Sequence, residues 1–590
     1  MTRQLVVVSV IFGAAFTVGV SLALGSLLLR RLRLAFHRLE GLLFAFLAGS
    51  ACLSLATFLL CVIQQARLAV FLAGGAGVVA WAIWEARLDP PAPALPGLPR
   101  LWLVIFAIGF AAFFICYFSN ALAPEISPDG SSYHLGNVAR CWRHQGFDWS
   151  YHSIYSSLPQ GMEMLFLVAF CFGRHSSAAM VHMAFQAALP LLIVCYGCRF
   201  GFPRIGAFAA LLVYACPVAG IAGISAYNDL TVATLLFAGF YLLQVKHEYN
   251  IFNLLLLIGL LAGFAYAVKY TAGLALPVAV GFSKGKRLLP LSLGAAIMAG
   301  PWILRNWLWL GNPVAPFLNL WFPNAYWSAA AEHQYLAGLG QYPTFKSYFD
   351  FVMQLSVLGG LVPGMIGPAF LLLPLCLLAL RHPHGRRALA AGVVYAIPAL
   401  FNTEIRFLIP ALPFFALALG LAMENSWGAL PAVALLQAVL CWPAVMTAYC
   451  DPNAWRVRGF PWRAALRLDP EAQYISSRVG DYALKDAVEQ AVPAKGRIFS
   501  FAGRAAAYLD RDIIVGYEST QGMVAAQLLE KAAAAGTGLR AATVSLRRMG
   551  FGFILVNDSD AVAESMNHYF TSWGLTKVAE ANGTALYRLD

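Results

Sequence analysis

The sequence predicts a mostly α-helical protein that crosses a membrane many times and ends in a smaller α/β domain. Of its 590 residues, 60% are hydrophobic and only 12% are charged. The mean hydropathy is +0.68, so the apolar residues exceed what a soluble core holds. They fall into runs that approach the ~20 residues needed to cross a bilayer. After about Asp451 the composition becomes that of a soluble domain.

The apolar runs predict about fourteen transmembrane helices. The run 161–172 is short for a span, and we expect it to lie in the membrane interface, because a crossing there would place Arg199 and Arg204 outside. The predicted spans are 5–29, 41–63, 68–85, 101–120, 176–198, 206–222, 230–245, 250–266, 271–283, 288–305, 351–380, 388–402, 407–422 and 427–448.

Basic residues set the expected orientation. Arg30, Arg31, Arg33 and Arg38 separate the first two spans and belong in the cytoplasm by the positive-inside rule. Alternation then places two large loops, 121–175 and 306–350, on the extracytoplasmic side. Three further basic clusters fall inside, at Lys246 and His247, at Lys284, Lys286 and Arg287, and at Arg381, Arg386 and Arg387. The formal net charge of +12 therefore reflects topology, and we expect no nucleic-acid partner.

Residues 451–590 are expected to form an extracytoplasmic α/β domain. Apolar runs at 497–502, 513–517, 551–557 and 584–589 predict strands, and 522–535, 540–549 and 559–572 predict helices. No phosphate-binding loop or nucleophile elbow stands out in this region. We expect it to pack over the membrane part or to recognise an acceptor.

The first polar stretch suited to chemistry runs from Glu125 to His134. Ser127 can cap a helix, Pro128 suits its first position, and Asp129 then lies in the first turn of a helix running toward Arg143. Three- and four-residue spacing places Asp129, Tyr133, Asn137 and Arg140 on one face of that helix. The alternative is a capped amphipathic helix that lies on the membrane.

Ionisable residues recur at the outer ends of several predicted spans: Asp129, Asp229, Lys269, Arg305 and Arg406. Cations and carboxylates at a membrane surface suit a reaction in which a sugar leaves a lipid phosphate, because the cations hold the phosphate and a carboxylate takes the proton of the attacking hydroxyl. Each residue also has a simpler interpretation. The basic side chains can snorkel at span ends, and Asp229 can cap a helix.

The order of motifs resembles the GT-C superfamily of membrane glycosyltransferases, with the protein O-mannosyltransferase-like and lipid A aminoarabinose-transferase-like branches nearest. The similarity covers roughly 101–425. After the loop carboxylate, the motifs are Pro159-Gln160-Gly161 through Leu165, Tyr227-Asn228-Asp229-Leu230, Gly263 to Thr271, Pro301 to Asn306 with Gly311-Asn312-Pro313, and Arg406 to Pro413.

The resemblance implies a GT-C-like helical bundle at 101–450, with extra helices in 1–100, and an inverting transfer from a polyprenyl-phosphate sugar to a glycan, lipid or protein acceptor. Asp129 matches the catalytic base and Asp229 the later acidic position. The implied substrate-binding residues are Tyr133, His134, Lys269, Arg305, Asn306 and Arg406.

The sequence departs from the family pattern in three places. Gly130 follows Asp129 where many members have a second acid, Gln160 stands where a second proline is usual, and no lysine precedes Pro159. The first departure weakens the case for a divalent metal ion, for which Asp129 and Asp229 are the only candidate ligands. No other cofactor is expected.

Composition and charge parity predict a multi-pass protein of the inner or plasma membrane, with its active site and C-terminal domain on the extracytoplasmic (periplasmic) side. The alternative function is a transporter or flippase for a lipid-linked or polar substrate. The short runs 250–266 and 271–283 and the Pro363-Gly364 break within 351–380 favour that alternative, because transporters use broken spans.

Overall fold

The computed structural model describes residues 3–87, 92–151, 153–245, 248–283, 288–426, 428–536 and 539–590. The predicted cytoplasmic residues Lys246, His247, Lys284, Lys286 and Arg287 lie outside the described residues. The chain forms two compact units. The first contains Met1–Ala123, Pro159–Trp302 and Leu339–Leu466, and the second contains Pro124–Leu158, Ile303–Gly338 and Arg467–Asp590.

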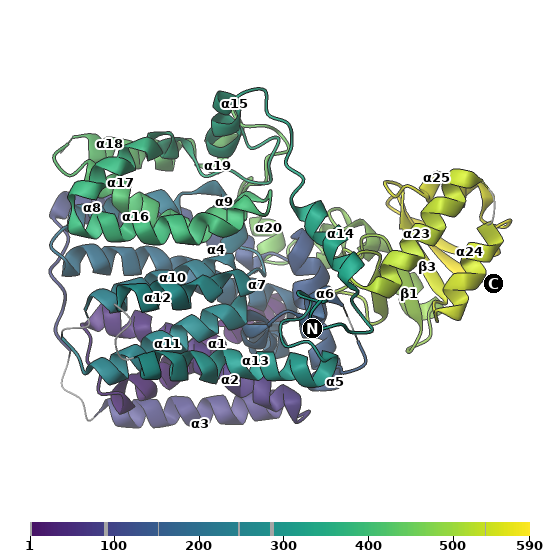
Figure 1. The fold of residues 1–590 in the computed structure, drawn as a ribbon, viewed down its shortest axis with the longest axis horizontal. Helices are drawn as coiled ribbons and strands as arrows, with labels where there is room; N and C mark the ends of the chain where they lie inside the picture. The colour runs from purple at the N-terminus through teal and green to yellow at the C-terminus, as the bar shows by residue number, and fades with distance from the viewer. Residues whose placement is uncertain are drawn as a thin grey trace. The chain divides into compact units, whose positions relative to one another are not determined.

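The first unit is a helical bundle, and most of its long helices run roughly parallel to one another (Figure 1). Its helices are α1 (Arg3–Arg31), α2 (Arg38–Val62), α3 (Leu68–Ala86), α4 (Arg100–Leu122), α7 (Gly161–Arg199), α8 (Pro203–Tyr214), α9 (Pro217–Gly223), α10 (Asp229–Gln244), α11 (Ile251–Val268), η2 (Tyr270–Leu274), α12 (Ala275–Phe282), α13 (Leu288–Leu310, which continues into the second unit), α15 (Tyr348–Met353), η3 (Gln354–Leu358), η4 (Pro368–Arg381), α16 (Pro383–Ala396), η5 (Ile397–Leu400), η6 (Ile405–Ala411), α17 (Leu412–Ala422), α18 (Ala429–Leu440), α19 (Pro443–Met446) and α20 (Trp462–Ala465).

The protein is a multi-pass membrane protein. Within the described ranges, eight helices are long and apolar enough to cross a membrane, and the pair α8 and α9, bent by 67°, makes a ninth candidate. The other predicted spans, 230–245, 271–283, 351–380, 388–402 and 427–448, are helical but shorter or broken.

The predicted span 351–380 is not one continuous helix, and its break includes the Pro363-Gly364 position noted in the sequence. The helical segments α15 and η3 end at Leu358, and a non-helical stretch precedes η4, which begins at Pro368. Three glycines in this region have positive φ, including Gly364 at +102° and Gly367 at +100°. Other residues rarely adopt that backbone conformation, and the helix therefore stops there. The loop 306–350 also differs from expectation, since it contains the helix α14 (Ala329–Leu339).

Residues 161–199 form two helical segments joined at one non-helical residue. Arg174 has φ 59° and ψ −147°, which interrupts the hydrogen-bond ladder of α7. The break falls between the predicted runs 161–172 and 176–198. Helix α7 packs against α1, α2, α8 and α10 and lies at the centre of the bundle.

The helices α1 and α2 approach so closely that their contact requires glycine. A Cβ atom at Gly25 would overlap the backbone of Ala45, and one at Gly49 would overlap the backbone of Ser21. Small residues at such a crossing let two backbones come together, as is common in membrane helix pairs.

The second unit contains a five-stranded mixed sheet in the order β2-β1-β3-β5-β4. Strands β1, β2 and β3 are parallel, and β5 is antiparallel to both β3 and β4. The strands are β1 (Arg497–Ser500), β2 (Asp512–Val515), β3 (Phe553–Asn557), β4 (Leu575–Ala581) and β5 (Thr584–Leu589). Four of them match predicted strands, and β4 was missed.

The helices predicted in the C-terminal region are present. They are α23 (Thr520–Ala535), α24 (Leu539–Arg548) and α25 (Ala563–Tyr569), and they lie beside the sheet (Figure 1). The unit also contains η1 (Gly130–His134), α5 (Leu135–His144), α6 (Ile154–Ser157), α14, α21 (Glu471–Ser476), η7 (Gly480–Leu484) and α22 (Lys485–Ala491).

Segments of both predicted outer loops fold together with the C-terminal sheet. The amide of Ala507 donates to the carbonyl of Ser131 (2.9 Å), and the amide of Thr520 donates to the carbonyl of Tyr326 (3.1 Å). The side chain of Tyr151 belongs to the same hydrophobic core as Phe499. The unit that contains the sheet is therefore assembled from three separate parts of the chain.

Candidate active site

A buried ion pair joins the start of α10 to the end of α11. The Nζ atom of Lys269 lies 2.6 Å from Oδ1 of Asp229, whose residue is only 2% exposed. The two helices form a hairpin, so the first residue of α10 lies beside the residue that follows α11. Asn228 strengthens this junction, because its side-chain amide donates to the carbonyl of Val268 (3.2 Å).

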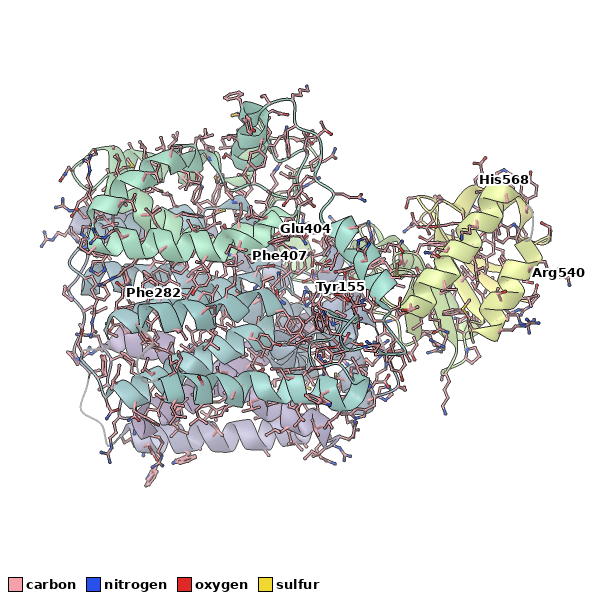
Figure 2. The ribbon with its side chains drawn as sticks, viewed as in Figure 1. Tyr155, Phe282, Glu404, Phe407, Arg540 and His568 are labelled. Carbon is pink, nitrogen blue, oxygen red and sulfur yellow. The ribbon has the colours of Figure 1, made fainter. Side chains whose placement is uncertain are left out.

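A second cation stands next to this pair. Arg406 forms an ion pair with Glu404, and its guanidinium lies over the ring of Tyr227 at 5.0 Å. The ring of Phe407 faces both cations, with Lys269 Nζ at 4.2 Å and the Arg406 guanidinium at 6.0 Å. Glu404 and Phe407 come from adjoining positions of one segment (Figure 2). The first unit thus gathers three predicted site residues, Asp229, Lys269 and Arg406.

His182 fixes the backbone that carries Asp229. Its Nε2 accepts from the amide of Leu230 (3.2 Å), and its Nδ1 lies 2.9 Å from the carbonyl of Ser225. Because Leu230 supplies a proton to Nε2, the ring proton must reside on Nδ1, which donates to Ser225. The side chain is completely buried. Nothing in the local sequence distinguishes this histidine from one that packs in an apolar helix.

In the second unit, Tyr133, one helical turn after Asp129, holds the Asp129 carboxylate. The hydroxyl of Tyr133 donates to Oδ2 of Asp129 at 3.0 Å, as their four-residue spacing suggests. The helix here is wider than predicted, since Gly130–His134 form a π-helical turn before α5. Such turns are rare and frequently mark functional sites.

The predicted capping role of Ser127 is wrong. Within the described residues its hydroxyl has no hydrogen-bond partner, and its carbonyl instead accepts from the amide of Ser131 (2.9 Å). The Glu125 carboxylate takes the local capping position by accepting from the Ser127 amide (2.7 Å). A Cβ at position 130 would lie 2.9 Å from the carboxyl carbon of Glu125. A larger residue at position 130 would therefore have to displace the Glu125 carboxylate and the Ser127 hydroxyl.

His134 is 3% exposed, and its ring centroid lies 4.3 Å from that of Tyr133. These contacts give it a packing role beside the Asp129 turn.

Arg305 and Asn306 hold the end of the first outer loop. The Arg305 guanidinium donates to the carbonyls of Ser156 (3.0 Å), Ser157 (3.2 Å) and Leu158 (3.2 Å). Asn306 also donates to Ser157 (2.7 Å). Arg305 is only 5% exposed. These carbonyl contacts assign both residues to shaping the loop.

A buried polar network lies next to the Asp129 turn. Arg140 contacts Asp512 (3.2 Å) and Asp148 (3.6 Å) and stacks over the ring of Tyr151 at 3.3 Å. Burial raises the pKa of Glu518 to about 7, against the opposing effect of Arg140 and of hydrogen bonds from neighbouring hydroxyls. Arg140, Tyr151 and Glu518 line a cavity of about 20 Å³, which is room for about one water molecule.

The candidate metal ligands do not fit a divalent ion. Oδ1 of Asp229 is taken by the Lys269 ammonium, and Oδ2 of Asp129 accepts from Tyr133. A hard divalent cation needs several oxygen ligands. Among the described residues, no group of three or more His, Cys, Asp and Glu side chains is placed to hold one.

Comparison with known proteins gives a structural match without a sequence match. No family model matches the chain, and no curated protein matches it by sequence. The fold is similar to ArnT from Cupriavidus metallidurans bound to undecaprenyl phosphate, at 14% identity and a TM-score of 0.50, covering 83% of this chain and 98% of that chain. The apo state of the same protein gives 13% identity and a TM-score of 0.51, with the same coverage.

A third structure is the archaeal oligosaccharyltransferase AglB from Archaeoglobus fulgidus, in complex with an inhibitory peptide and a dolichol-phosphate. It is 11% identical, with a TM-score of 0.43, and covers 80% of this chain and 71% of that chain. We draw nothing from so low a score. ArnT is a lipid A aminoarabinose transferase of the GT-C superfamily. This chain has the GT-C-like fold of ArnT, in agreement with the fold predicted from its motifs.

Proposed function

We propose that this protein is a glycosyltransferase that moves a sugar from a polyprenyl-phosphate donor to an acceptor hydroxyl, with inversion, at the extracytoplasmic side of the inner or plasma membrane. The observation that carries the proposal is the pair of cations Lys269 and Arg406, gathered around Phe407 beside the buried Asp229. The fold adds support, because ArnT has been solved with undecaprenyl phosphate bound.

Lys269 and Arg406 are suited to bind the carrier phosphate. Each now pairs with one carboxylate, Asp229 or Glu404, and a phosphate diester monoanion can accept hydrogen bonds from both cations at once. During transfer the bond between the sugar's anomeric carbon and the phosphate oxygen breaks, and its electron pair leaves with the phosphate. The two cations stabilise the negative charge that grows on this leaving group.

Asp129 is suited to activate the acceptor. Its carboxylate takes the proton of the acceptor hydroxyl while the hydroxyl oxygen forms the new bond to the anomeric carbon from the face opposite the departing phosphate. The hydrogen bond from Tyr133 holds the carboxylate in one orientation. Asp229 acts through Lys269 as a positioning residue. Arg305 and Asn306 are also positioning residues, because they bind backbone carbonyls of the outer loop that begins with the Asp129 turn.

Binding of undecaprenyl phosphate to the full-length protein in nanodiscs tests the cation site. We expect Lys269→Met and Arg406→Met each to weaken binding by about 10- to 100-fold, which is the usual contribution of a charge-assisted hydrogen bond. Lys577→Met is the matched control, because that lysine pairs with the half-exposed Glu580 in the sheet region. Unchanged affinity in both test variants would reject the phosphate site.

A second function, transport or flipping of a lipid-linked substrate, is favoured by one observation. The helices α8 and α9 form a pair bent by 67° at a short break, and broken helices are typical of transporter binding sites. Proteoliposomes with a fluorescent polyprenyl phosphate in one leaflet distinguish the two functions. A transferase leaves the label in its original leaflet, whereas a flippase equilibrates it between leaflets.

A further inference from the structure

Four tyrosines from separate segments of the second unit gather around the Asp129 turn. Tyr133 and Tyr155 stack face to face, with ring centroids 3.7 Å apart and planes 7° apart. Tyr517 meets Tyr155 edge to face at 6.5 Å. Tyr335 on α14 packs with Tyr155 against the same small hydrophobic cluster. We call these four residues the tyrosine cluster.

The carboxylate of Asp129 belongs to the surroundings of this cluster. It accepts a hydrogen bond from the hydroxyl of Tyr133, and its charge acts on both Tyr155 and Tyr517, whose pKa values rise mainly because of burial. The proposed base and the aromatic surface are thus parts of one local arrangement within the second unit.

The backbone holds the cluster in place. The amide of Ile154, next to Tyr155, donates to the carbonyl of Glu518, next to Tyr517 (2.7 Å). The amide of Ser328 donates to Thr520 Oγ1 (2.9 Å), which anchors the segment that leads into α14. Rings fixed in this way lose little conformational entropy when a ligand binds.

The cluster remains open to a ligand. Tyr517 is 42% exposed, and Tyr133, Tyr155 and Tyr335 are partly exposed (Tyr155 is labelled in Figure 2). Tyrosine presents an apolar ring and a hydroxyl that both donates and accepts hydrogen bonds. This combination matches a pyranose, which has an apolar C–H face and a rim of hydroxyl groups.

The charged side chains near the tyrosine cluster restrict the class of ligand that the cluster can bind. Asp129 places a carboxylate beside the cluster, and that charge repels an anionic ligand. The neighbouring cation Arg140 is already paired with Asp512 and Asp148. A neutral sugar fits this environment better than a phosphorylated or acidic one.

We propose that the tyrosine cluster is the acceptor subsite and that the acceptor is a neutral glycan, one hydroxyl of which reaches Asp129. This inference rests on the proposed function for the chemistry at that hydroxyl. The presence of the glycan site itself can be tested without any donor.

The test is binding of an array of neutral oligosaccharides, acidic oligosaccharides and peptides to the full-length protein in nanodiscs, with no donor present. We expect at least one neutral glycan to bind, and we expect Tyr517→Ala to weaken it by about tenfold, the loss of one aromatic contact. Tyr517→Phe keeps the ring and should retain most of the affinity. Tyr569→Ala is the control, because Tyr569 is 61% exposed on α25, outside the cluster.

Three outcomes overturn the proposal: no neutral glycan binds the wild type, Tyr517→Ala binds as tightly as wild type, or acidic glycans or peptides bind in preference to neutral glycans. Undecaprenyl phosphate binding, measured on the same variants, separates this inference from the proposed function. If glycan binding depends on Tyr517 but Lys269→Met and Arg406→Met leave the lipid affinity unchanged, the phosphate site fails and the glycan subsite stands.

Discussion

The carboxylate of Asp229 depends on a neighbouring helix for its position. His182 on α7 accepts from the first turn of α10 and donates to the carbonyl of Ser225 that precedes it. We therefore infer that the imidazole acts as a brace for the segment that carries Asp229.

Two substitutions of His182 distinguish a hydrogen-bonding role of its side chain from a packing role. His182→Leu fills a similar space but leaves the buried amide of Leu230 without its imidazole acceptor, at about 1–3 kcal/mol, while the carbonyl of Ser225 keeps the amide of Tyr227 as a donor (2.7 Å). We expect kcat to fall by about ten- to a hundredfold. His182→Gln can still accept and donate, and should retain kcat within a few fold. Equal loss of activity in both variants, at wild-type expression and thermal stability, would contradict the bracing role.

Glu518 makes the stability of the second unit depend on pH. Its pKa is raised from 4.5 to about 7 by burial, so between these values the folded state keeps a proton that the unfolded state has lost. Stability therefore falls as pH rises from about 4.5 to about 7, by at most about 3 kcal/mol. The thermal midpoint of the second unit can be measured by protease cleavage within 467–590. It should fall over this pH range in the wild type and change less with pH in Glu518→Gln. The same pH dependence of the thermal midpoint in the wild type and in Glu518→Gln would refute this role of Glu518.

Local spacing in the sequence predicted part of the site and missed the rest. The four-residue interval between Asp129 and Tyr133 predicted that they share a face, and the structure shows the hydrogen bond between them. His182 and Phe407 were missed because each touches the site through contacts distant in sequence. A single histidine or phenylalanine in an apolar run carries no local signal of such a role.

At the scale of elements, apolar length predicted the long helices well. Apolar length alone does not show where a helix stops, because hydropathy does not report backbone conformation, and the break between η3 and η4 was marked in the sequence only by Pro363-Gly364. Strand β4 was missed for a different reason. It lies at the edge of the sheet, and its charged residues, Lys577 and Glu580, break the apolar pattern.

The contact between α1 and α2 offers a test of helix packing. Gly25→Leu should separate the two backbones, because even a Cβ atom would overlap Ala45 there, and overpacking of this kind costs about 1–3 kcal/mol or more. Gly19→Leu, on the same helix, is the matched control, since its Cβ would meet nothing within 4 Å. We expect a lower thermal midpoint of the full chain in nanodiscs for Gly25→Leu alone. An equal midpoint in both variants would argue against this packing.

The sequence predicted only part of how the second unit is assembled. Charge parity predicted that both outer loops and the C-terminal domain share one side of the membrane. It could not predict that Tyr151 enters the core around Phe499, or that Arg305 binds three carbonyls of the first loop. Such contacts join segments that are distant in the sequence, and they depend on shape complementarity that no local pattern encodes.

The proposed function requires a lipid-linked sugar as the donor and Asp129 as the base. The most direct measurement is sugar transfer by the protein in proteoliposomes, with a panel of polyprenyl-phosphate sugars and the matching nucleotide sugars as donors. We predict transfer from a lipid-linked donor only, and its loss in Asp129→Asn at unchanged expression, folding and undecaprenyl phosphate affinity. Transfer from a nucleotide sugar, or wild-type rates in Asp129→Asn, would contradict this account.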